Sequence, residues 1–234
     1  MEPSQQPGDR QALLSALADP QRLRIVDALA LSDRSPSELS RALDLPSNLL
    51  AHHVGVLVDA GAVLRRRSEG DGRRSYLALS WDRPLVAATV TQGPAITACR
   101  VVFVCTANSA RSQFAASLFA RQSDVPVASA GTAPAPAINP QAIVELARHG
   151  LAPLSPAPRA LADERRTGDL VVTVCDNARE ATDGDTRLHW SVPDPARASA
   201  GGGKDDDATA AFADAFAQIE PRVQRLAAAL TNGS

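Results

Sequence analysis

The chain has 234 residues, of which 44% are hydrophobic, so it is long enough for two packed domains. Its formal net charge is only −2, so bulk charge predicts neither nucleic-acid nor membrane binding, and any nucleic-acid contact must come from a local patch. Three cysteines do not make a disulfide framework. Because neither a signal pattern nor a membrane-spanning apolar run is found, we expect a cytoplasmic protein with no membrane partner.

Short helices are predicted along the first sixty residues, at 9–17, 21–31, 35–43 and 48–60. In the first of them, helical spacing places Leu13, Leu14 and Leu17 inward. Asp19 before Pro20 is typical of an N-cap followed by a first-turn proline, and Ser47 is expected to cap the fourth helix. Two short helices joined by the turn at 44–46 predict a helix-turn-helix.

A β-hairpin follows, with strands at 62–67 and 73–79 and a turn at 68–72. The helices and the hairpin together predict a winged helix-turn-helix domain, mainly α with one β-hairpin, over residues 1–90. An apolar stretch at 85–90 is expected to form a closing helix. The Gly-Pro pair at 93–94 places a linker at 91–98 and a second domain at 99–234.

The stretches Leu17–Val26 and Leu50–Val63 resemble the ArsR family of bacterial repressors. This resemblance implies a homodimer that binds an inverted-repeat operator in double-stranded DNA, with a recognition helix from about Ser47 to Asp59 in the major groove. Many metal-sensing members carry a cysteine pair on the helix before the recognition helix. Residues 35–43 contain no cysteine, so a thiolate sensor at that position is excluded.

The hairpin concentrates positive charge and is the predicted patch for DNA phosphates. Its arginines are Arg65, Arg66, Arg67, Arg73 and Arg74, with Glu69 and Asp71 in the turn. Base edges are expected to contact Ser47 and Asn48. His52 and His53 lie about 100° apart on a helix, so we favour DNA-facing or packing roles over metal binding and predict no metal site. The alternative is a dimerisation module whose arginines form only a solvated face.

The second domain alternates strands and helices, which predicts an α/β fold with a flavodoxin-like, four-stranded parallel sheet. Strands are expected at 100–104, 126–132, 169–175 and from 188 onward. Helices are expected at 112–121, 139–149, 159–166 and 208–230. Within them, apolar spacing predicts that Ile143, Val144 and Leu146 face inward, together with the residues Phe212, Phe216, Ile219, Val223 and Leu226.

Between the first of these strands and its helix lies a loop that opens with Cys105 and closes with Arg111. Backbone N–H groups and the helix dipole make such a loop an anion site, and the same field stabilises a thiolate. Arg111 can fold back as a planar fork onto a tetrahedral oxyanion. The unit is therefore interpreted as a thiolate nucleophile in a cradle for phosphate or a phosphate mimic.

Val102–Gln113 resembles the phosphate-binding loop of the low-molecular-weight phosphatase and thioredoxin-coupled arsenate reductase superfamily. The resemblance implies that the oxyanion binds at Thr106, Ala107, Asn108, Ser109, Ala110, Arg111 and Ser112. It also implies that Asp194, in the Asp-Pro loop, is the general acid beside the nucleophile Cys105. Asn108 is expected to hold the loop and Ser112 to donate to the thiolate.

The two branches of this superfamily differ in what happens to the covalent adduct. Gln113, the lack of a tyrosine near Asp194, and Cys175 at a strand end favour arsenate reduction, with Cys175 as resolving thiol. Thr182 stands where the thioredoxin-coupled enzymes have a further cysteine. Two routes stay open: a Cys105–Cys175 disulfide opened by thioredoxin, or attack by an external thiol of the mycothiol or glutaredoxin type. No bound cofactor is expected, and oxyanion sensing without turnover and phosphate-ester hydrolysis are the alternatives.

Overall fold

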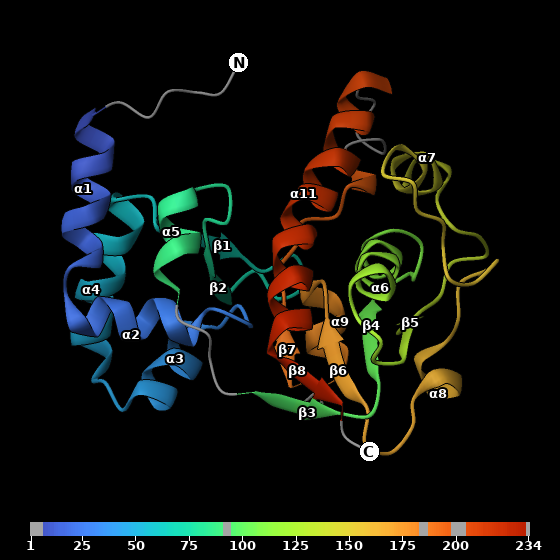
Figure 1. Ribbon diagram of the computed structural model, residues 1–234, viewed down its shortest axis with the longest axis horizontal. Helices are drawn as coiled ribbons and strands as arrows, with labels where there is room; N and C mark the ends of the chain where they lie inside the picture. Colours follow the sequence, from blue (N-terminus) through green and yellow to red (C-terminus); the bar gives the residue numbers. More distant parts are fainter. Residues whose placement is uncertain (1–6, 91–94, 183–186, 198–204, 233–234) are drawn as a thin grey trace. The chain divides into compact units, whose positions relative to one another are not determined.

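The computed structural model describes residues 7–90, 95–182, 187–197 and 205–232 (Figure 1). The chain divides into two compact units. The first contains residues 1–68 and 72–93, and the second contains 69–71 and 94–234. Each unit is described by itself. Part of the expected linker, 91–94, lies outside the described residues.

The first unit consists of short helices and one antiparallel hairpin. The helices are α1 (Pro7–Leu17), α2 (Pro20–Ala28), α3 (Pro36–Leu43), α4 (Ser47–Asp59) and α5 (Pro84–Thr89). Strands β1 (Val63–Arg67) and β2 (Ser75–Leu79) pair with Arg65 opposite Leu77. Asp19 caps α2 by accepting from the Arg22 amide, and Ser35 with Glu38 forms a capping box on α3. The expected winged helix-turn-helix elements are therefore present.

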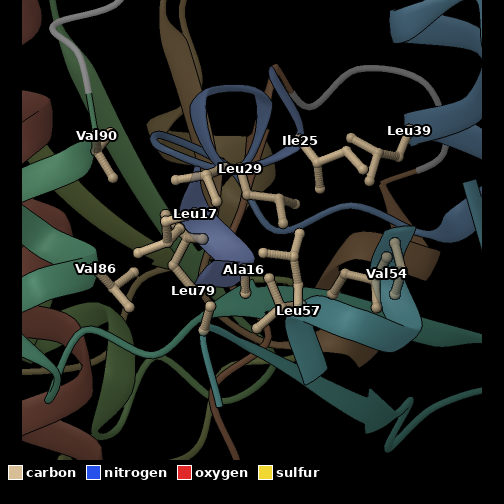
Figure 2. Close-up of a cluster of buried hydrophobic side chains, with 14 of the residues drawn as sticks. Ala16, Leu17, Ile25, Leu29, Leu39, Val54, Leu57, Leu79, Val86 and Val90 are labelled. Atoms are coloured by element: carbon tan, nitrogen blue, oxygen red, sulfur yellow. The ribbon is translucent and has the colours of Figure 1, made fainter. Parts of the chain in front are cut away.

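The core of the first unit is aliphatic, as Figure 2 shows, with side chains from every helix and from β2 converging. Ile25, Leu39 and Leu57 are fully buried in it. Two sequence predictions were wrong here. Leu14 is 47% exposed on the outer face of α1, and Pro46 rather than Ser47 occupies the N-cap of α4, with no side-chain capping bond.

The second unit is built on a four-stranded parallel sheet in the order β5-β4-β6-β7. The strands are β4 (Val101–Cys105), β5 (Val127–Gly131), β6 (Leu170–Thr173) and β7 (Leu188–His189). All five residues of β4 are buried, as its unbroken apolar run predicted. A separate parallel pair joins β3 (Ile96–Ala98) to β8 (Leu230–Asn232). The predicted α/β class with this sheet is confirmed.

The described helices of the unit include α6 (Arg111–Gln122), α7 (Pro140–Arg148), α8 (Leu161–Glu164), α9 (Asp176–Ala181) and α11 (Asp205–Ala229). The helix α6 packs on β4, β5 and α11, while α9 packs on β4 and β6. Phe114 of α6 meets Phe216 of α11 edge-on at 5.5 Å, and the predicted inward stripe of α11 is buried. The predicted inward positions of Ile143 and Val144 were wrong, since they are 45% and 46% exposed.

Among the described residues, no helix combines the length and apolarity needed to cross a membrane.

Candidate active site

The loop between β4 and α6 is held from outside by backbone hydrogen bonds. Four of its carbonyl groups accept from amides of the segment that follows β5: Thr132 to Cys105, Ala133 to Thr106, Ala135 to Ala107 and Asn139 to Ser109, at 2.9–3.1 Å. With these carbonyls turned outward, the amides that follow them point to the opposite side, toward the loop interior. This arrangement suits an anion at the N-terminus of α6.

Asn108 fixes the shape of the loop. It is fully buried and adopts a left-handed backbone, with φ of 51°. Its side chain donates to Ser112 Oγ at 2.8 Å and accepts from the Arg159 amide at 2.8 Å. Gly131 lies directly behind the loop, where a Cβ would stand 2.6 Å from Thr106 O. The loop therefore requires both the asparagine and the glycine.

Cys105 opens the loop with its side chain directed inward. Its Sγ lies 3.1 Å from Ser112 Oγ and accepts from the Asn108 amide at 3.1 Å. Only 2% of the residue is exposed. A hydroxyl group and a backbone amide therefore both face the sulfur of the predicted nucleophile.

Arg111 begins α6 and folds over the loop, where it is 5% exposed. Its Nη1 donates to Val192 O at 2.9 Å and to Glu69 Oε2 at 3.3 Å, and its Nη2 lies 3.2 Å from Asp194 Oδ2. Burial works against its charge, but the thiols and carboxylates around it raise the pKa of Arg111. The guanidinium is thus a fixed positive charge between the loop and Asp194.

Cys175 lies beside the loop as the N-cap of α9. Its Sγ accepts from the Ala178 amide at 3.4 Å and lies 3.5 Å from Thr106 Oγ1. Burial raises the pKa of Cys175, and the nearby Cys105 adds to this rise while Arg111 opposes it. Cys99, in contrast, is exposed.

A buried polar chain next to Cys175 was missed by sequence reasoning. His189 contacts Asp176 Oδ1 through Nε2 at 3.2 Å and Thr173 Oγ1 through Nδ1 at 3.0 Å. Burial opposes ionisation of Asp176, yet the hydrogen bonds from His189, the Glu69 amide and Ser191 hold its pKa below the usual value. Because His189 and Ser191 precede Asp194, these hydrogen bonds tie the Asp-Pro loop to the start of α9. The one available signal was that Asp176 follows Cys175 directly.

The predicted DNA-contact residues fall into two groups. Ser47, Asn48 and His52 are exposed on α4, and four hairpin arginines are exposed, while Arg66 is half-buried. His53 is only 8% exposed and its Nδ1 lies 3.9 Å from Asp19 Oδ1, so a DNA-facing role for this residue was wrong and the packing role holds. Within the described ranges, no cluster of three His, Cys, Asp or Glu side chains has metal-binding geometry.

Comparison with known proteins follows the division of the chain. Residues 100–233 match the family model of the low molecular weight phosphotyrosine protein phosphatase, and residues 17–66 match a helix-turn-helix domain. No protein of curated function matches the chain.

Solved structures that resemble the chain cover one part each. An arsenate reductase from Archaeoglobus fulgidus is 29% identical, over 55% of this chain and 98% of its own, with a TM-score of 0.43. The tyrosine phosphatase AmsI from Erwinia amylovora is 20% identical, over 57% and 94%, with a TM-score of 0.47. HlyU from Vibrio cholerae is 30% identical, over 35% and 80%, with a TM-score of 0.31.

Proposed function

We propose that this chain, which belongs through residues 100–233 to the low molecular weight phosphotyrosine protein phosphatase family, reduces arsenate to arsenite with a thiolate in its oxyanion loop. A helix-turn-helix domain precedes the enzyme domain. The observation that carries the proposal is a second thiol, Cys175. Its Sγ contacts the Thr106 hydroxyl of the loop that Cys105 opens. A hydrolytic reaction has no use for that thiol.

In the first step, the Cys105 thiolate attacks arsenic and an S–As bond forms. One arsenate oxygen leaves as water, for which Asp194 supplies the proton. Arg111 and the amides from Thr106 to Ser112 hold the remaining oxygens and their negative charge. The contact between Asp194 and Arg111 supports this role, because it keeps the Asp194 carboxyl group beside the loop.

In the second step, the thiolate of Cys175 attacks Cys105 Sγ. A disulfide forms, the S–As bond breaks, and its electron pair stays with arsenic, which leaves as arsenite. Arsenic is thereby reduced by two electrons and the two thiols are oxidised. An external thiol, either thioredoxin or a small thiol of the mycothiol or glutaredoxin-coupled type, then reduces the disulfide. No bound cofactor takes part in this scheme.

The test is single-turnover arsenite formation by the reduced full-length protein without added thiol. We expect about one arsenite per chain, loss of the product in Cys105→Ser and in Cys175→Ser, and full product in Cys99→Ser. Cys99 is the matched control because it is an exposed cysteine of the same unit. Full arsenite yield from Cys175→Ser would contradict the resolving role.

Hydrolysis of phosphate monoesters is the second candidate, favoured by the side chain at position 182. The Thr182 hydroxyl donates to Ala178 O at 2.7 Å, where the thioredoxin-coupled enzymes have a further cysteine. No third thiol is therefore present at the end of α9 to accept the disulfide from Cys175. Hydrolysis of p-nitrophenyl phosphate that depends on Cys105 but not on Cys175, without arsenite formation, would establish this reaction instead.

For the first unit we propose operator binding by an ArsR-like homodimer. The exposed residues Ser47, Asn48 and His52 would contact bases, and the hairpin arginines Arg65, Arg66, Arg67, Arg73 and Arg74 would contact phosphates. Binding to a duplex from the promoter of its own gene should weaken when Arg65, Arg66 and Arg67 are replaced by Ala, and the salt slope should fall by about 0.9 per lost contact. Arg148→Ala, half-exposed on α7, is the control for loss of an arginine outside the hairpin. Unchanged affinity and slope in the triple variant would refute this assignment.

A further inference from the structure

The Glu69 carboxylate contacts the guanidinium of Arg111, the group that binds the substrate oxyanion in the proposed reaction. Residues 69–71 belong to the second unit. Glu69 Oε2 accepts from Arg111 Nη1 at 3.3 Å, and Oε1 accepts from the Asp194 amide at 3.0 Å. The Glu69 side chain is only 17% exposed. The Glu69 carboxylate is therefore an anion already bound to both Arg111 and the backbone of Asp194.

The backbone of this segment is anchored as well as its side chain. The Glu69 amide donates to Asp176 Oδ2 at 2.9 Å, and the Asp71 amide donates to Glu180 Oε2 at 2.7 Å. Between them, a Cβ on Gly70 would lie 2.2 Å from Glu180 Oε2, so position 70 has no room for a side chain as the atoms stand. Two backbone hydrogen bonds and a close-fitting glycine hold the Glu69 carboxylate in place. An ordinary surface ion pair has no such anchors.

We propose that Glu69 is an internal competitor for the oxyanion site, and that it lowers the affinity of this site for arsenate and phosphate. The inference rests on the proposed oxyanion chemistry at Cys105. Both anions need Arg111, and a dianion in the loop would repel a carboxylate a few ångströms away, so the two cannot be bound together at full strength. A tetrahedral oxyanion in the loop also reaches the loop amides, whereas the Glu69 carboxylate contacts Arg111 and the Asp194 amide, so at sufficient concentration the oxyanion displaces Glu69.

The size of the effect follows from population arithmetic. The apparent affinity equals the intrinsic affinity multiplied by the fraction of molecules in which Glu69 does not occupy Arg111, that is, in which the site is open. A hydrogen bond to a charged group contributes enough to close the site in roughly 90–99% of molecules, so removal of the Glu69 charge should tighten oxyanion binding about 10- to 100-fold.

The experiment measures inorganic phosphate binding to the reduced full-length protein by calorimetry, for the wild type and for Glu69→Gln, which keeps shape but removes charge. We expect Kd to fall about 10- to 100-fold in Glu69→Gln and to a similar degree in Glu69→Ala. Glu220→Gln, an acid-to-amide change at an ion pair on α11, should leave Kd unchanged. With arsenate or p-nitrophenyl phosphate as substrate, the same variants should lower KM much more than they change kcat.

An unchanged or higher Kd in Glu69→Gln, with the variant folded by circular dichroism, would overturn the proposal. So would tighter binding in Glu220→Gln to the same degree, because a general loss of negative charge would then explain the effect. Phosphate binding is read without turnover. If Glu69→Gln binds phosphate more tightly but the protein forms no arsenite, the proposal that Glu69 competes for the site would therefore stand, and the proposal of arsenate reduction would be wrong.

Discussion

Gly131→Ala is expected to disable the loop although it replaces none of the residues that are proposed to carry the chemistry. The added Cβ would stand 2.6 Å from Thr106 O and 3.1 Å from the Asn108 amide nitrogen and Cβ. An ordinary C···O contact is about 3.3 Å or longer, so backbone must move by about 0.7 Å. Such overpacking costs about 1–3 kcal/mol of stability, and displacement near 1 Å at a reacting centre costs about 10²-fold in rate.

The assay for this variant pairs an unfolding curve with phosphate affinity and single-turnover rate, at a temperature where the variant is folded. Gly55→Ala is the matched control, because its Cβ meets nothing within 4 Å in helix α4. The control should gain about 0.5–1 kcal/mol of stability and keep wild-type chemistry. A folded Gly131→Ala protein with wild-type phosphate affinity and rate would refute the argument that this glycine shapes the loop.

Three further changes test other parts of the molecule. Ser35→Ala removes the capping box with Glu38 and should cost about 1 kcal/mol, or about 4–8 °C in Tm of the first unit by calorimetry. Burial raises the pKa of Asp169, but the paired Arg100 lowers it, and the net change is a decrease. The stabilisation that Asp169 contributes is therefore present above the unfolded pKa of 3.8 and is lost as the pH falls through the lower folded pKa. Asp169→Asn should therefore lower Tm at pH 7 by the equivalent of about 1 kcal/mol, a deficit that shrinks below pH 4; a constant deficit contradicts the linkage. The raised pKa of Cys175 predicts that Cys175-dependent arsenite release accelerates from pH 7 to 9, up to about tenfold per unit, and a flat single-turnover profile would disprove this.

Elements with a strong local pattern could be predicted from the sequence. The buried run of β4 and the five-residue apolar stripe of α11 depend on neighbours a few residues apart, and both are present as expected. The α7 helix shows where this reasoning fails. Glu145 is 4% exposed because Arg148 and His149 pair with its carboxylate at 3.0 and 3.1 Å. Its inward position rotates the buried face away from two adjacent aliphatic residues that the apolar pattern alone places inside.

The predictability of the candidate site follows the same distinction between near and distant partners. The Cys105, Asn108 and Ser112 contacts arise within one loop, so the motif contains both partners of each hydrogen bond. The contact of Glu69 with Arg111 spans 42 residues, and nothing in the sequence around either residue encodes its partner. In the sequence, Glu69 is one acid among arginines in a turn. Only the fold shows that its carboxylate lies against the Arg111 guanidinium.

The environment of Cys175 bears on which reductant completes the proposed cycle. Thr182 donates to Ala178 O and Arg179 O, so its hydroxyl closes the last turn of α9, and Cys175 caps the first turn. The contact of Cys175 Sγ with Thr106 Oγ1 at 3.5 Å keeps the second thiol beside the loop. Cys105 is 2% exposed and Cys175 is fully buried, so a disulfide between them would form below the surface. Thiol–disulfide exchange requires direct access to a sulfur, and this burial favours a small thiol over a protein reductant.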